Sequence, residues 1–65
     1  MAYILTAFDK DHRLVMEHTE TSKGAALIGF DIWCDGSLDE TGRMDYVDLL
    51  DTETGEVLLS GKVVR

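Results

Sequence analysis

The stretch MDYVDLLDTETGEVLLSGKVV, residues 44–64, decides the fold. Two runs rich in β-forming residues, 44–51 and 56–64, flank the short polar segment TETG. Gly55 can adopt the positive φ that short hairpin loops require, and the Asp51 carboxylate can accept hydrogen bonds from N–H groups of the turn. The stretch therefore predicts a β-hairpin.

The beginning of the chain repeats this pattern. AYILTAF, residues 2–8, and RLVMEHT, residues 13–19, are two further strand-like runs separated by the polar turn DKDH. Alternation in the second run places His18, half-buried, on one face with Leu14 and Met16. We expect a second hairpin, whose turn carboxylates Asp9 and Asp11 accept local backbone hydrogen bonds.

The segment between the hairpins has the pattern of a helix. Thr21 or Ser22 can cap its N-terminus, and Gly36 can supply the left-handed residue at its end. A stripe at i, i+4 and i+7, flanked by two isoleucines, gives it a wide apolar face: Ala26, Phe30 and Trp33, with Ile28 and Ile32. Gly24 and Gly29 argue against a helix, since each costs ~1 kcal/mol relative to alanine. A buried strand over ALIGFDIW is the alternative.

These elements predict a single α+β domain spanning residues 1–65, with the order β-β-α-β-β. Two hairpins form an antiparallel sheet, and the helix packs on one face of it. Because apolar side chains alternate onto both faces, the uncovered face is expected to form an interface, either in a homodimer or with a partner. Changes at Tyr3, Leu5 or Tyr46 are expected to disturb that interface.

Cys34 is the only cysteine, so a disulfide within the chain is excluded and a reducing compartment, the cytoplasm, is favoured. The first residues lack the basic segment of a signal peptide, and no apolar run has the ~18–20 residues of a membrane span. We therefore expect no contact with membranes.

Negative charge is concentrated in the second half of the chain. The net charge is −7. One base, Arg43, lies within residues 31–56 among nine acids: Asp31, Asp35, Asp39, Glu40, Asp45, Asp48, Asp51, Glu53 and Glu56. Such a chain should be repelled by nucleic acids and anionic lipids, whereas a basic protein is electrostatically allowed.

Metal binding has weak support in the sequence. Asp35, Ser37 and Asp39 occupy positions 1, 3 and 5 of a calcium-loop spacing, but Glu40 replaces the usual glycine and Tyr46 the bidentate glutamate. His12, His18 and Cys34 lack the spacing of a transition-metal site. A weak cation or small-ligand site in the Asp35–Asp39 loop remains one hypothesis, and we expect no cofactor.

Catalysis is not expected either. Cys34 would lie near the C-terminus of the helix, beside Asp31 and Asp35. The helix dipole and the two negative charges at this position raise a thiol pKa rather than lower it. The sequence contains neither a phosphate-binding glycine motif nor a serine nucleophile motif. The protein is therefore expected not to be an enzyme.

The favoured hypothesis is a small acidic binding protein that presents carboxylates, with Tyr46 as a contact anchor, to a basic protein. The candidate interaction residues are Asp39, Glu40, Asp45, Tyr46, Asp48, Asp51, Glu53 and Glu56. In one form, they block a site that otherwise binds nucleic acid. The alternatives are a structural or accessory subunit that assembles through its apolar sheet face, with the acids serving solubility, and the cation or small-ligand site.

In size, charge and element order, the chain is similar to small acidic proteins carried by phages and mobile elements. That resemblance implies action by binding, in some cases by obstruction of nucleic-acid-binding machinery.

Overall fold

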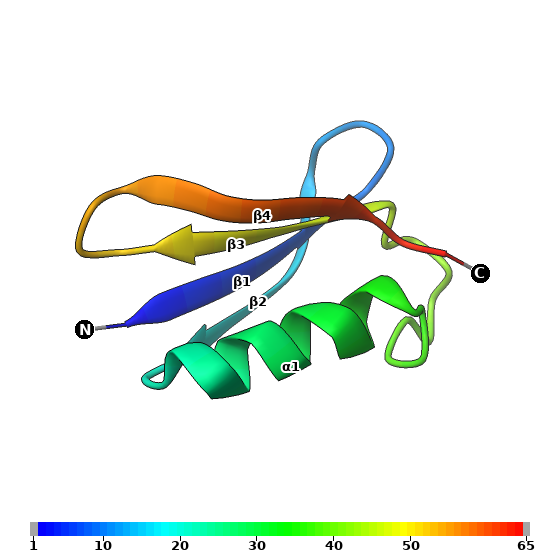
Figure 1. Ribbon diagram of the computed structural model, residues 1–65. Helices are drawn as coiled ribbons and strands as arrows, with labels where there is room; N and C mark the ends of the chain where they lie inside the picture. The colour runs from blue at the N-terminus through cyan, green and yellow to red at the C-terminus, as the bar shows by residue number, and fades with distance from the viewer. Residues whose placement is uncertain (1, 65) are drawn as a thin grey trace.

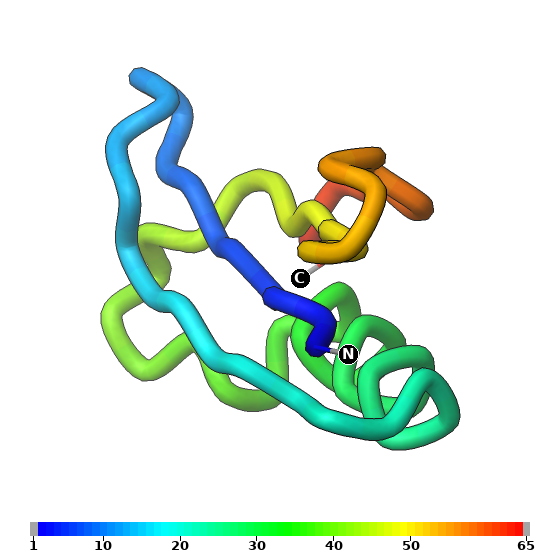
Figure 2. The backbone as a smooth tube through the Cα atoms, turned by 90° about the vertical axis from the view of Figure 1, so that its left-hand side faces the viewer, coloured from blue at the N-terminus to red at the C-terminus, as the bar shows by residue number. Residues whose placement is uncertain are grey.

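Four antiparallel strands form one sheet, and a single helix lies across one of its faces (Figures 1 and 2). The computed structural model describes residues 2–64. The elements are β1 (Tyr3–Phe8), β2 (Leu14–Glu20), α1 (Lys23–Cys34), β3 (Tyr46–Asp51) and β4 (Glu56–Lys62). The predicted α+β class, the β-β-α-β-β order and the two hairpins are confirmed, and the segment 26–33 is helical rather than a strand.

The strand order is β2-β1-β3-β4, so the first strand lies inside the sheet. β1 pairs antiparallel with both β2 and β3, which therefore run parallel to each other on either side of it. The helix makes the connection from β2 to β3 across β1. It packs mainly against β1 and β3.

The turns and the helix start use the side chains that the sequence suggested, except that Asp11 contributes its N–H rather than its carboxylate to the first turn. Asp9 Oδ1 accepts hydrogen bonds from the N–H groups of Asp11 and Arg13, at 2.8 and 2.9 Å. Gly55 has a φ of 75°, and Asp51 Oδ1 accepts a 2.9 Å bond from the N–H of the turn at residue 53. Ser22 caps α1 by accepting from the N–H of residue 25, and a φ of 80° at residue 36 ends it.

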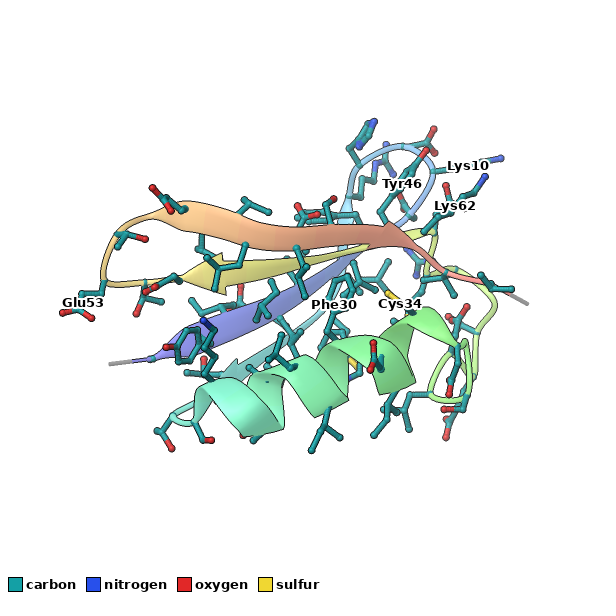
Figure 3. The ribbon with its side chains drawn as sticks, in the orientation of Figure 1. Lys10, Phe30, Cys34, Tyr46, Glu53 and Lys62 are labelled. Carbon is teal, nitrogen blue, oxygen red and sulfur yellow. The ribbon has the colours of Figure 1, made fainter. Side chains whose placement is uncertain are left out.

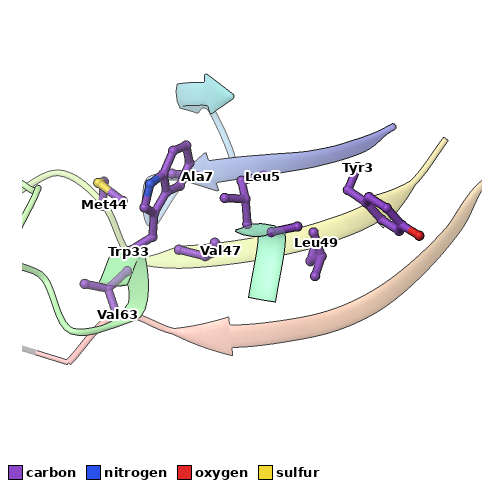
Figure 4. Close-up of a cluster of buried hydrophobic side chains, with 9 residues drawn as sticks. Tyr3, Leu5, Ala7, Trp33, Met44, Val47, Leu49 and Val63 are labelled. Atoms are coloured by element: carbon purple, nitrogen blue, oxygen red, sulfur yellow. The ribbon is translucent and has the colours of Figure 1, made fainter. Parts of the chain in front are cut away.

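The core lies between α1 and the inner face of the sheet (Figure 4). In the centre of this face, Leu5 of β1 stands opposite Leu49 of β3. The buried residues are Tyr3, Leu5, Ala7, Ala26, Trp33, Met44, Val47, Leu49 and Val63. The expectation that Tyr3 and Leu5 belong to the open interface is therefore wrong, because both are buried beneath the helix.

Met44 precedes β3 and is buried in the core. Two local predictions also need correction. Leu14 does not share the face of Met16 and His18, because the register shifts between Ala7 and Phe8. The His18 side chain is exposed rather than half-buried.

The apolar face of α1 is narrower than its composition suggested. Ala26 and Trp33 are buried, whereas Ile28 and Ile32 are 63% and 40% exposed. Both isoleucines turn away from the sheet, since the helix contacts it along one stripe only. No helix within residues 2–64 has the length and apolar character needed to cross a membrane.

Candidate interaction surfaces

The predicted acidic residues do not form one patch. Asp45 immediately precedes β3 and Asp51 ends it, so a rise of ~3.4 Å per residue separates them by about 20 Å. Figure 3 shows the same separation, with Glu53 at one end of the molecule and Tyr46 at the other. The set is therefore divided between the two ends of the sheet and its open face.

One end gathers carboxylates from three strands and a turn. Register places Glu20 of β2 and Asp51 of β3 on either side of Tyr3, and Glu56 of β4 beside Asp51. Glu53 lies exposed in the turn between β3 and β4. We call these four residues, Glu20, Asp51, Glu53 and Glu56, the acidic end. Lys23 begins the helix at the same end of the molecule.

Glu20 belongs to the acidic end, although it was not among the residues predicted from the sequence. It lies thirty-one positions before Asp51 in the sequence, and only the pairing of both with Tyr3 brings them into one row. Its Oε1 also contacts Nε2 of His18. The register of the first hairpin could have revealed half of this arrangement, but the β1–β3 pairing has no local signal.

Bases gather at the opposite end, where they alternate with acids. A surface hollow of about 450 Å³ is lined by Asp9, Lys10, Asp11, Arg13, Gly42, Arg43 and Asp45. Lys62 ends β4 at the same end of the sheet, opposite Tyr46 (Figure 3). We call the set Asp9, Lys10, Asp11, Arg13, Arg43, Asp45 and Lys62 the mixed-charge end. Asp45 is therefore accompanied by bases and differs in setting from the acidic end.

Asp9 is integrated into the turn that it begins. The N–H of Arg13 is the largest influence that lowers the pKa of Asp9, helped by the N–H of Asp11 and the positive charges of Arg43 and Arg13, while partial desolvation opposes them. Arg43 Nη2 lies 3.8 Å from Asp9 Oδ2. The Asp9 carboxylate therefore stabilises the turn between β1 and β2.

Tyr46 lies on the open face among aromatic and basic side chains rather than among acids. Phe8 and Lys62 are its neighbours across the strands. The ring of His12 stacks on it, with centroids 5.6 Å apart and an interplanar angle of 8°. His12 has a φ of 62°, a left-handed conformation uncommon for residues with a Cβ. The stack covers part of the ring that was proposed as a contact anchor.

Asp39 and Asp35 shape the loop after the helix. Asp39 accepts hydrogen bonds from the N–H groups of Arg43 and Met44, at 3.1 and 3.2 Å. Asp35 Oδ1 accepts a 2.7 Å bond from the N–H of Ser37. The Ser37 hydroxyl, followed by that N–H, lowers the pKa of Asp35, and desolvation opposes this effect. Glu40 is exposed beside a hollow that Met44 also lines.

These bonds direct the carboxylates of the loop towards its own backbone. Within residues 2–64, the structure contains no group of three or more His, Cys, Asp or Glu side chains arranged to hold a metal ion. The loop hypothesis for a cation consequently gains no support from its geometry.

Asp48 lies in the middle of the open face. Its Oδ1 accepts a 2.6 Å hydrogen bond from the hydroxyl of Ser60. The strand register aligns Asp48 and Ser60 with two further polar residues, so that a polar row crosses all four strands: Glu17, Thr6, Asp48 and Ser60. The row separates Ile4, Leu50 and Val57 on one side from Leu14, Phe8 and Tyr46 on the other. The open face is thus not a continuous apolar surface.

Cys34 is half-buried at the end of α1, between the helix and the sheet (Figure 3). Burial raises the pKa of its thiol, and the charges of Asp31 and Asp35 raise it further. At neutral pH the thiol is protonated, which is the unreactive form. The predicted direction of the pKa shift is confirmed, with desolvation as its largest cause.

Comparison with known proteins finds no family model, curated protein or solved structure that matches this chain. Its function must therefore be inferred from the arrangement of its charges and apolar side chains.

Proposed function

We propose that this chain is a non-catalytic binding protein that docks its acidic end onto a basic surface of another protein. The observation that supports this function is the separation of charge along the strands. Carboxylates from β2, β3 and β4 converge at one end, while Lys10, Arg43 and Lys62 lie with acids at the other. A partner with a basic groove is attracted to the first end and gains little at the second.

The structure narrows the residues that we assign to this contact. Glu20, Asp51, Glu53 and Glu56 form the proposed surface. Asp39 is engaged by its own loop, Asp45 lies among bases, and Asp48 bonds to Ser60 on the open face. We do not assign these three to the partner.

In its strongest form, the proposed contact occupies a site that otherwise binds nucleic-acid phosphates. Arginine and lysine side chains that bind phosphate oxygens also bind carboxylates, with charge-assisted hydrogen bonds in both cases. Carboxylates that lie in a row across one end of a sheet can therefore compete with phosphates for such a site. The net charge of −7 opposes attraction of the chain itself to nucleic acid.

The test compares two variants of equal net charge. The acidic-end variant is Glu20→Gln/Asp51→Asn/Glu53→Gln, and the control is Asp11→Asn/Asp31→Asn/Glu40→Gln. Immobilised parent and variants are used to capture proteins from native lysate, which are eluted with a salt gradient and identified by mass spectrometry. The expected result is a basic protein that the parent and the control retain at low salt and the acidic-end variant loses.

Salt dependence completes the test. Affinity for the identified partner should fall steeply with ionic strength, because the interaction is between surface charges. Competition with an oligonucleotide then tests the strong form. Equal retention of the partner by the parent and both variants would show that the acidic end is not the contact surface.

A further inference from the structure

The edge strand β2 has backbone groups that face outward. At the two ends of β1, the carbonyl groups of Ala2 and Phe8 accept hydrogen bonds from N–H groups on the side of β3. Backbone groups alternate in direction along a strand, so the odd-numbered residues of β1 bond to β2 instead. Their partners in β2 are residues 20, 18 and 16. Glu17 and Thr19 consequently direct their N–H and C=O groups away from β1, to the open side of the sheet.

This edge is accessible to another chain. β2 lies at the outside of the sheet (Figure 2, cyan), and Glu17, His18 and Thr19 are all exposed. An edge strand with outward N–H and C=O groups is a template on which an extended segment of another protein can pair. The side chains around the edge then decide which segments fit.

An apolar hollow adjoins the start of β2. It has a volume of about 370 Å³ and lies between β2 and the loop that follows α1. Its apolar lining consists of four side chains: Val15, Met16, Leu38 and Met44. Met44 is buried, whereas Leu38 is 50% exposed. The hollow can therefore receive one apolar side chain from a segment that pairs with β2.

Two carboxylates lie along the same strand, one on each face of the sheet. Glu17 aligns with Thr6 and lies on the open face, whereas Glu20 aligns with the buried Tyr3 and lies on the face that carries the helix. β2 contains no lysine or arginine. Glu20 Oε1 contacts Nε2 of His18, and its other carboxylate oxygen makes no hydrogen bond within residues 2–64. A strand beside β2 is therefore favoured when it carries bases opposite Glu17 and Glu20.

We propose that β2 binds an extended basic segment of the partner protein, which extends the four-stranded sheet by one strand. The segment pairs antiparallel with Glu17 and Thr19, the arrangement that is more stable per residue. Read from its N-terminus, it carries a base opposite Glu20, two further residues, a base opposite Glu17 and an apolar residue opposite Met16. Side chains opposite each other share a face, so the apolar residue lies on the face of Met16, where the hollow is. This inference rests on the proposed function, because it names the form in which a basic partner makes contact.

Hydrogen exchange tests the pairing directly. Isotope-labelled protein is titrated with the peptide acetyl-Thr-Lys-Thr-Val-Lys-Leu-Thr-amide and followed by NMR. The amide protons of Glu17 and Thr19 should exchange rapidly with solvent in the free protein, and the peptide should slow them in proportion to the fraction bound. The N–H of His18 faces β1, so its exchange should be slow with or without the peptide.

Two control peptides separate the effect of charge from that of the apolar side chain. In one, glutamates replace both lysines, and this peptide should not bind. In the other, serine replaces leucine, and binding should weaken by about threefold or more because the hollow stays unfilled.

A pair of protein variants tests the place of the contact. Glu17→Lys should weaken binding of the first peptide by about fivefold or more, because like charges then lie opposite each other. Asp31→Lys makes the same change of charge at an exposed position of α1 and should have a much smaller effect. Circular dichroism checks that both variants are folded.

Unchanged exchange of Glu17 and Thr19 at millimolar peptide would overturn the inference, as would equal binding of the charge-reversed peptide. A peptide that affects only the turn around Glu53 would also overturn it, while the proposed function would stand. Conversely, slowed exchange of Glu17 and Thr19 would support pairing at β2 even if the acidic-end variant kept every protein captured from lysate, a result that would refute the proposed function alone.

Discussion

Gly29 of α1 lies directly against Leu5 of β1. A Cβ on Gly29 would come to 2.8 Å from Leu5 Cδ1, closer than side-chain carbons normally approach. Leu5 is 1% exposed and stands opposite Leu49, so it is held by the core around it. The helix can approach the sheet this closely because residue 29 has no side chain. A glycine that is unfavourable for the helix alone is therefore required by packing.

Gly29→Ala and Gly24→Ala should change stability in opposite directions. Both substitutions gain up to ~1 kcal/mol of helix propensity. At position 24 the new Cβ would lie 3.7 Å from Ser22 Oγ, an ordinary contact, so the gain remains. At position 29 overpacking costs ~1–3 kcal/mol, which should outweigh the gain in helix propensity. Urea unfolding of both variants gives the comparison, and equal stabilisation of the two would contradict the close approach.

A second substitution in the core tests whether contact with Leu5 causes the loss of stability expected for Gly29→Ala. Leu5→Val removes one methylene and should cost ~0.5–1.5 kcal/mol of unfolding free energy in the parent. In the Gly29→Ala background the same change makes room for the added methyl group, so its cost should be smaller. The coupling between the two sites, measured as a double-mutant cycle, should therefore be favourable.

The local elements could be predicted from the sequence because their signals are local. Asp51 and Gly55 form the second turn as expected, and Ser22 and Gly36 bound the helix. Strand order has no such local signal, since the pairing of β1 with β3 joins residues that lie 38 to 48 positions apart. Nothing in either strand specifies this partner, so the row that contains Glu20 and Asp51 could not be anticipated.

The predicted interaction residues do not lie together, for the same reason. Proximity in sequence placed Asp45 and Asp51 together, but an extended strand carries them to opposite ends of the molecule. Register shifts in the sheet changed the faces of further residues, including Leu14. Such bulges depend on how the strands fit against each other, which a pattern of alternation does not contain.

Acid should destabilise the protein partly through two turn carboxylates. The pKa values of Asp9 and Asp35 are lowered in the folded state, chiefly by hydrogen bonds from Arg13 and Ser37 respectively. The unfolded chain therefore binds protons first as the pH falls. The stabilising contribution is complete above the unfolded pKa of about 4 and is lost as the pH falls through the folded values.

Asp9→Asn/Asp35→Asn should consequently flatten the loss of stability between about pH 5 and the acid limit. Asparagine keeps the acceptor oxygen of each turn and removes the titration. Urea midpoints measured across this pH range give the slope. Asp11→Asn is the control, because its N–H rather than its carboxylate is bonded in the turn. Equal slopes for the double variant and the control would refute the assignment.

Cys34 should react slowly with alkylating reagents while the protein is folded. Burial first, and then Asp31 and Asp35, raise the pKa of its thiol, and the thiolate is the reactive form. The rate of reaction with iodoacetamide at about pH 8 should be well below that in denaturant, where the ordinary pKa of about 8.5 applies. Asp31→Asn should lower the apparent pKa in the pH profile of the folded protein. A folded rate equal to the denatured rate would contradict the raised pKa.

Asp39 should matter for stability rather than for cation binding. Its carboxylate accepts from the N–H groups of Arg43 and Met44 and so positions the chain that enters β3. Asp39→Ala removes both acceptors and should lower the unfolding free energy by ~1–2 kcal/mol, whereas Asp39→Asn keeps one acceptor oxygen and should cost less. Thermal unfolding of the parent with and without calcium supplies the second measurement. Because the loop carboxylates are bonded to backbone, calcium should leave the melting temperature unchanged. A rise with calcium that Asp39→Asn abolishes would instead establish the loop as a cation site.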